Sequence, residues 1–99
     1  MMERLQPQLT SADRRALKGK AQHLEPVLKV GHSGVTEAFL ASVRNELALH
    51  ELIKVKFVAF KEKRRELASQ IAESSESALV QVVGHVAVLY KPRPSDSAR

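Results

Sequence analysis

Residues 26–35 read PVLKVGHSGV, and this stretch decides the fold of the chain. A short apolar run from Val27 to Val30 ends at the turn Gly31-His32-Ser33-Gly34, and a helical pattern opens at Val35. A G-x-x-G turn between a strand and a helix brings backbone amides close to a bound group with no side chain in the way. It also aims those amides and the positive helix end at one point, which suits a phosphate. The turn predicts a phosphate site; the alternative is a tight connection only.

Length and composition set limits on this interpretation. With 99 residues, of which 43% are hydrophobic, the chain is expected to fold as one domain with a single modest core. A formal charge of +5 and a pI of about 9.9 favour a polyanionic partner. The sequence has no cysteine, which excludes disulfides, thiolate metal sites and cysteine nucleophiles, and which fits a reducing compartment.

The beginning of the sequence and its apolar runs bear on location. Residues 1–7 lack the apolar segment of a secretory signal. No apolar run approaches the ~18 residues that a membrane-spanning helix needs. We therefore expect a cytoplasmic protein that has no membrane partner.

The charges are unevenly distributed along the chain. Residues 66–90 contain no Lys or Arg but carry Glu66, Glu73 and Glu76, so all 16 cations lie elsewhere. A surface that is charged only for solubility intersperses both signs. The pattern predicts one positive side and one neutral or acidic side.

Periodicity and turn residues predict seven elements. A first helix, capped by Thr10 or Ser11, runs to about Gln22. The remaining elements are a strand at 27–30, a helix at 35–50, a strand at 52–59, a helix at 61–74, and strands at 78–83 and 86–91 joined by Gly84-His85. The order α-β-α-β-α-β-β belongs to the α/β class. Because strand-helix-strand units favour parallel neighbours and the last two strands form a hairpin, we expect a four-stranded mixed sheet.

The strand at 52–59 shows which face of the sheet is buried. Ile53, Val55, Phe57 and Ala59 alternate with the lysines at 54 and 56. The second and third helices are expected to pack on the apolar face, and the lysine face to be at least partly wet. Periodicity does not place the first helix. We expect one domain at 9–93, with flexible tails at 1–8 and 94–99.

The strand directions bring two basic junctions together. The C-terminal ends of parallel strands meet at one rim, where ligands of open α/β sheets gather. That rim would hold the glycine turn beside Lys61–Arg65, and also the Gly84-His85 turn if the third strand is parallel. Lys91 and Arg93 would lie at the opposite edge. Phe60 is the one plausible exposed stacking ring, so phosphate contacts rather than base stacking should dominate.

With these residues in view, the chain resembles the CRM/YhbY family of small RNA-binding proteins. The resemblance covers roughly residues 9–93. It is carried by the segments LKGKA at 17–21, VGHSGVTE at 30–37, HELIKVK at 50–56, VQVVG at 80–84 and VLYKP at 88–92.

The resemblance implies a fold similar to the C-terminal domain of translation initiation factor three. It also implies a glycine loop like that of KH domains, no catalysis, and binding to precursors of the large ribosomal subunit. Gly31 and Gly34 match the loop glycines, with His32 and Ser33 as the variable middle. Many relatives place Lys or Arg in that middle, whereas His32 is charged only when protonated.

We predict that RNA contacts come from the glycine turn and from three groups of cations. Four cations in a first helical turn are unfavourable without a partner, which favours RNA contact there; the alternative is a solvated helix start. Arg64 could instead lie along the core edge with its stem buried. For the first-helix cations, the alternative is a helix face that serves solubility. The candidate residues are Gly31, His32, Ser33, Gly34, Lys61, Lys63, Arg64, Arg65, Arg14, Arg15, Lys18, Lys54 and Lys56.

These patterns lead to a functional hypothesis. The four histidines show no metal-ligand spacing, and no catalytic constellation emerges, so we expect no metal, no cofactor and no enzyme activity. We expect a monomer that binds ribosomal RNA in pre-large-subunit particles as an assembly factor, with no small-molecule substrate. The alternative is a protein-interaction module that docks a ribosomal or assembly protein through the cation-free side at 66–90.

Overall fold

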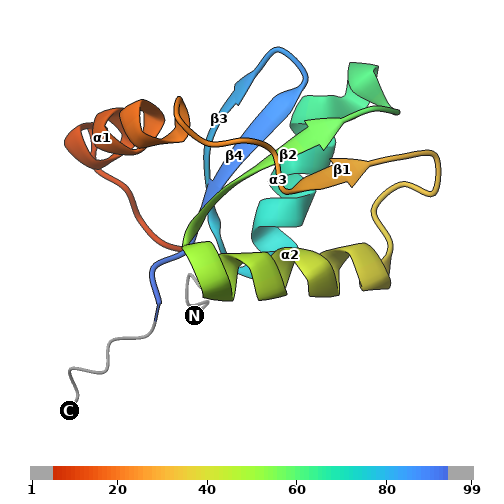
Figure 1. Cartoon of the computed structure of the whole chain (residues 1–99), viewed down its shortest axis with the longest axis horizontal. Helices are drawn as coiled ribbons and strands as arrows, with labels where there is room; N and C mark the ends of the chain where they lie inside the picture. The colour runs from red at the N-terminus through yellow and green to blue at the C-terminus, as the bar shows by residue number, and fades with distance from the viewer. Residues whose placement is uncertain (1–5, 94–99) are drawn as a thin grey trace, which may run out of the picture.

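The structure, a computed structural model, describes residues 6–93 (Figure 1). Its elements follow the predicted order α-β-α-β-α-β-β, with one short 3-10 helix added. They are α1 Ser11–Ala21, β1 Leu28–Val30, α2 Glu37–His50, β2 Leu52–Phe57, η1 Lys61–Lys63, α3 Arg64–Ser75, β3 Ala78–Val83 and β4 Val86–Tyr90. The expected tail residues 1–5 and 94–99 lie outside the described residues, whereas the Gln6 amide donates to the Ser77 carbonyl at 2.9 Å.

The observed boundaries differ from the predicted ones where the backbone leaves regular geometry. β2 ends at Phe57 rather than at residue 59, because the amides of Val58 and Ala59 both turn to the Val30 carbonyl, each at 3.0 Å. The helix predicted to begin at 61 begins as the 3-10 helix η1 and becomes α-helical at Arg64. α2 begins at Glu37 rather than at residue 35, because Thr36 is its N-cap.

The four-stranded mixed sheet is confirmed, with the strand order β1-β2-β4-β3. β1 and β2 are parallel neighbours, as expected, and β4 pairs antiparallel with both β2 and β3. β3 therefore runs in the same direction as β2 but is separated from it by β4. The expectation that consecutive crossover strands are neighbours holds for β1 and β2 only.

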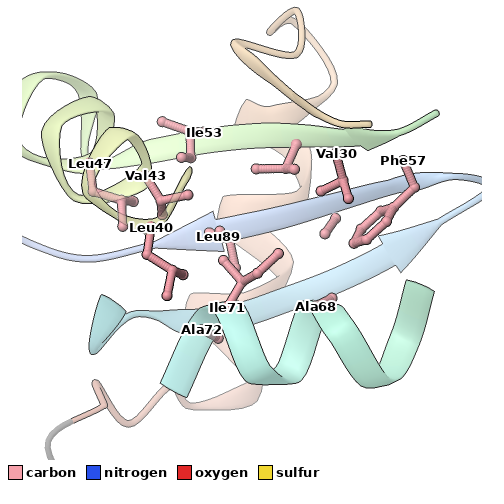
Figure 2. Packing of buried hydrophobic residues seen from close by; sticks show 12 residues of the cluster. Val30, Leu40, Val43, Leu47, Ile53, Phe57, Ala68, Ile71, Ala72 and Leu89 are labelled. Carbon is pink, nitrogen blue, oxygen red and sulfur yellow. The ribbon is translucent and has the colours of Figure 1, made fainter. Parts of the chain in front are cut away.

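The main core lies between the sheet and the two helices α2 and α3. Ile53, Val55 and Phe57 of β2 are at most 1% exposed. They pack, as predicted, against buried side chains of both helices, and Figure 2 shows several of these residues pointing into one shared layer. Burying each of these large side chains contributes about 1.5–3 kcal/mol relative to leaving it exposed. The helix residues in this core are Leu40, Val43, Leu47, Ala68, Ile71 and Ala72.

The first helix covers part of the opposite face. Leu17 and Ala21 of α1 pack against Leu52, Val80 and Val88, which form a second, smaller core. Figure 1 shows α1 lying apart from α2 and α3. α1 packs on Leu52, at the start of β2, whereas Lys56, on the same face toward the end of β2, is exposed.

Candidate nucleic-acid interface

The ends of β1 and β2 lie side by side at one rim of the sheet, as the parallel pairing predicted (Figure 1). The Val30 carbonyl, at the end of β1, accepts hydrogen bonds from two backbone amides that follow β2. The ring of Phe60, just before η1, lies against Gly34. The glycine turn and the basic junction are therefore one continuous surface.

The glycine turn is closed by a hydrogen bond from the Gly34 amide to the Gly31 carbonyl at 3.0 Å. Gly34 has a φ of +76°, which favours glycine, and His32 and Ser33 are exposed at the tip. α2 begins only at Glu37, and the Thr36 hydroxyl accepts from the Phe39 amide at 3.0 Å. The prediction that this helix begins at Val35, directly after the turn, is therefore wrong. The Phe39 amide, in the first turn of α2, is already bonded to Thr36.

The second junction presents cations at the start of α3. Phe60 adopts the left-handed conformation, with φ 55° and ψ 38°, and it turns the chain into η1. Lys61, Lys63 and Arg65 are exposed. Lys63 is the N-cap of α3, and its side chain makes no capping hydrogen bond. The N-terminus of α3 therefore lies directly beside these cations.

Arg64 differs from its neighbours. Its side chain is half-buried, its Nη1 donates to the Lys61 carbonyl at 2.7 Å, and its Nε is enclosed without a partner among the described residues. This is the placement along the core edge that the alternative interpretation described. Arg64 holds η1 against α3, and the exposed charge comes mainly from its neighbours.

The hairpin turn Gly84-His85 also lies at this rim. The Phe57 amide donates to the His85 carbonyl at 2.7 Å, which joins the turn to the end of β2. The turn is predicted to lie at this rim if the third strand runs parallel to the others, and β3 does run in the direction of β2.

The two β2 lysines lie on the face of the sheet that α1 covers in part. Lys54 is half-buried, and its Nζ donates to the Leu24 carbonyl at 2.9 Å, while Lys56 is exposed. Lys29 of β1 is the register partner of Lys56 and is exposed on the same face. Sequence reasoning missed Lys29, because a three-residue strand is too short to show alternation.

The α1 cations are separated from the rim. Arg14 is half-buried, and its Nη1 donates to the carbonyls of Leu79 and Val80 at 2.9 and 2.6 Å, where β3 has a bulge. Arg15 and Lys18 are exposed, but α1 lies on the opposite face of the sheet from α3. The fold therefore does not bring these three residues together with Lys61–Arg65.

The two ends of the sheet differ in whether their cations form ion pairs. At the end where β2 begins, two cations pair with carboxylates, Lys91 with Glu76 and Arg93 with Glu51, each at 3.7 Å. His50 also lies 3.5 Å from Glu46 there. Lys91 and Arg93 lie there as predicted, because Tyr90 pairs with Leu52. Within residues 6–93, no candidate cation forms an ion pair. The exposed carboxylates nearest in sequence to the rim are Glu62 and Glu66, beside the cations, and Glu37, after the glycine turn. The four cations at 61–65 outnumber these three carboxylates by one.

The fold and the glycine turn define a small α/β domain of the CRM type. The model of the CRS1 / YhbY (CRM) domain matches residues 9–91. A Haemophilus influenzae protein named "RNA-binding protein" is 42% identical over 92 residues, covering 92% of this chain and 91% of its own. A Pseudomonas aeruginosa protein named "Probable RNA-binding protein" is 40% identical over 87 residues, covering 87% of this chain and 84% of its own.

A solved structure agrees with this assignment. The solution structure of a hypothetical protein from Staphylococcus aureus superposes with a TM-score of 0.78 at 30% identity, covering 90% of this chain and 94% of the other. The chain therefore belongs to the CRS1/YhbY (CRM) domain family, which confirms the resemblance and the fold. The family is non-enzymatic, which confirms the expectation that the protein is not an enzyme.

Two further findings concern membrane spans and metal sites in the described part of the chain. Among residues 6–93, no helix has the length and apolarity that would let it cross a membrane. The same residues contain no cluster of three or more side chains suited to hold a metal ion.

Proposed function

We propose that this CRM-domain protein binds RNA through the rim formed by the glycine turn and Lys61–Arg65. The observation that carries the proposal is the division of charge, because cations at the far end of the sheet are paired whereas those at the rim are not. Unpaired cations beside an exposed glycine turn suit a phosphate backbone. The naming of the relatives as RNA-binding proteins supports the same partner.

The rim favours contacts to phosphates over contacts to bases. Phe60, 45% exposed, is the one aromatic side chain among the described residues that counts as exposed, and part of its ring lies on Gly34. Phe57 is fully buried. Proteins that read unpaired bases use several exposed rings, whereas phosphate contacts position an RNA without reading its sequence. Binding should therefore depend strongly on salt and weakly on sequence.

Gly31 gives a sharper indication of a ligand. Its φ lies outside the positive range, and a Cβ added there would meet nothing within 4 Å. The fold itself therefore does not require glycine at this position. A phosphate that approaches the backbone would require it, so Gly31→Ala should weaken RNA binding without lowering stability.

The finer assignment follows the family resemblance. We propose that the RNA is ribosomal RNA in precursors of the large ribosomal subunit, and that the protein acts as a monomeric assembly factor in the cytoplasm. Ultraviolet cross-linking in cells, mapped to RNA position and protein residue, tests this role. Adducts to large-subunit RNA through Lys61, Lys63 or Arg65 support it. Protein adducts through Glu66 or Glu73 without RNA adducts would favour the protein-docking alternative.

The direct test measures affinity for structured ribosomal RNA fragments against salt concentration. The double variant Lys63→Gln/Arg65→Gln removes two exposed rim cations and leaves the half-buried Arg64 in place. We expect the affinity for all fragments to fall to a similar extent. The slope of log affinity against log salt concentration should become shallower by about two, one for each lost phosphate contact. The matched control, Lys20→Gln/Arg44→Gln, removes two exposed cations from α1 and α2. Equal behaviour of the two double variants would contradict the assignment to the rim.

A further inference from the structure

The open half of the sheet carries a second concentration of positive charge. The four strands contain three lysines and no carboxylate, and all three lysines lie on the face opposite α2 and α3. Lys29 is the neighbour of Lys56, Lys56 pairs with Val86, and Val86 pairs with Val83, so these residues form one row across the sheet. We refer to Lys18, Lys29, Lys54 and Lys56 as the lysine face.

The free protein gains no stability from this arrangement. Neighbouring strands lie about 4.8 Å apart, and like charges at neighbouring positions destabilise a sheet. Both Lys29 and Lys56 are exposed, and neither forms an ion pair within residues 6–93. An anionic partner would remove this repulsion.

A groove continues the row toward α1. It lies between the C-terminal end of α1 and the sheet, with Lys18 and Lys54 among its lining residues. Its sheet side is formed by Gln81, Val86 and Val88, and its one carboxylate is Glu25. The surface combines positive charge, an amide and small apolar side chains, and it offers no aromatic ring for a base to stack on.

We propose that the lysine face is a second contact for the phosphate backbone of the same RNA, which passes from the rim around the end of β2 onto the open sheet. This inference rests on the proposed RNA binding. Lys56 and Phe60 are four residues apart, so their Cα atoms lie at most about 14 Å apart. A nucleic-acid duplex carries about one charge per 1.7 Å of axis, so one structured RNA offers enough phosphates for both surfaces. Val58, which is 48% exposed, lies between Lys56 and Phe60 in the sequence.

The test uses the double variant Lys29→Gln/Lys56→Gln with structured ribosomal RNA fragments as the probe. We expect affinity to fall at least about fivefold near physiological salt, and the salt dependence to become shallower by about two contacts. The melting temperature of the free variant should be equal to or above that of the unmodified protein, because the repulsion is gone. The charge-preserving variant Lys29→Arg/Lys56→Arg should keep its affinity, which separates lost charge from misfolding.

The outcomes separate this inference from the proposed function. In one outcome, Lys63→Gln/Arg65→Gln weakens RNA binding, but Lys29→Gln/Lys56→Gln behaves like the control Lys20→Gln/Arg44→Gln. The rim is then an RNA contact and the lysine face is not. If the unmodified protein binds RNA weakly and without salt dependence, the proposed function itself fails. Loss of a protein partner with unchanged RNA affinity would also overturn the inference.

Discussion

The ring of Phe60 lies against the backbone of Gly34, with its Cε2 atom 3.5 Å from the place where a Cβ on Gly34 would stand. Both residues have positive φ, +76° at Gly34 and 55° at Phe60. Two turns that are 26 positions apart in sequence are therefore in contact. This contact makes the glycine turn and the basic junction one surface.

The first prediction compares the two glycines of the turn. Gly34→Ala places a side chain at a φ that costs roughly 1–2 kcal/mol for residues with a Cβ. Each 1 kcal/mol of lost stability should lower the melting temperature of a domain of this size by about 4–8 °C. Gly31→Ala should stay within about 0.5 kcal/mol, because neither φ nor space is limiting there.

Thermal unfolding followed by circular dichroism measures both variants. RNA affinity at fixed salt completes the comparison, since Gly31→Ala is expected to lose affinity while remaining as stable as the unmodified chain. A stable Gly31→Ala variant with full affinity would show that no phosphate approaches the turn closely.

The second prediction concerns Arg14. Its guanidinium bonds two carbonyls at the β3 bulge, and hydrogen bonds from charged groups contribute about 1.5–3 kcal/mol. Arg14→Met keeps most of the stem and removes the donors, so we expect a loss of stability of that order. Arg15→Met, which alters an exposed neighbour, is the control and should change stability little. Urea denaturation of both variants checks the difference, and equal midpoints would contradict a structural role for Arg14.

Local pattern was sufficient to predict much of the fold. The alternation of Ile53, Val55 and Phe57 identified the buried face, and the glycine turns identified the ends of the strands. The parallel direction of β1 and β2 then brought two junctions to one rim, because direction alone decides where a parallel strand ends.

The sequence could not predict features that depend on contacts between distant residues. The insertion of β4 between β2 and β3 follows from pairing across the whole sheet rather than from any local signal. Arg14 meets the β3 carbonyls 65 and 66 positions away, so its structural role is not visible in the pattern of α1. The neighbouring Lys29 and Lys56 likewise depend on strand register.

The third prediction separates two adjacent arginines. Arg64 is half-buried and bonds the Lys61 carbonyl, whereas Arg65 is exposed. We expect Arg64→Ala to cost about 1–3 kcal/mol, and Arg65→Ala to stay within about 0.5 kcal/mol. RNA affinity should follow the opposite order once both variants are measured below their melting temperatures. Similar stability for the two variants would show that the Arg64 contact contributes little.

The fourth prediction concerns the tip of the glycine turn. His32 is exposed between the two glycines and forms no ion pair with the described residues, so a lysine fits there without disturbing the core. His32→Lys adds a permanent cation at the rim, and each added phosphate contact steepens the salt dependence by about one. Affinity for structured RNA should therefore rise, most clearly at low salt. His50→Lys, at the end of α2 and at the opposite end of the sheet, adds the same charge away from both proposed RNA contacts and is the control. If both lysines raise affinity equally, the gain reflects net charge alone and the turn does not touch the RNA backbone.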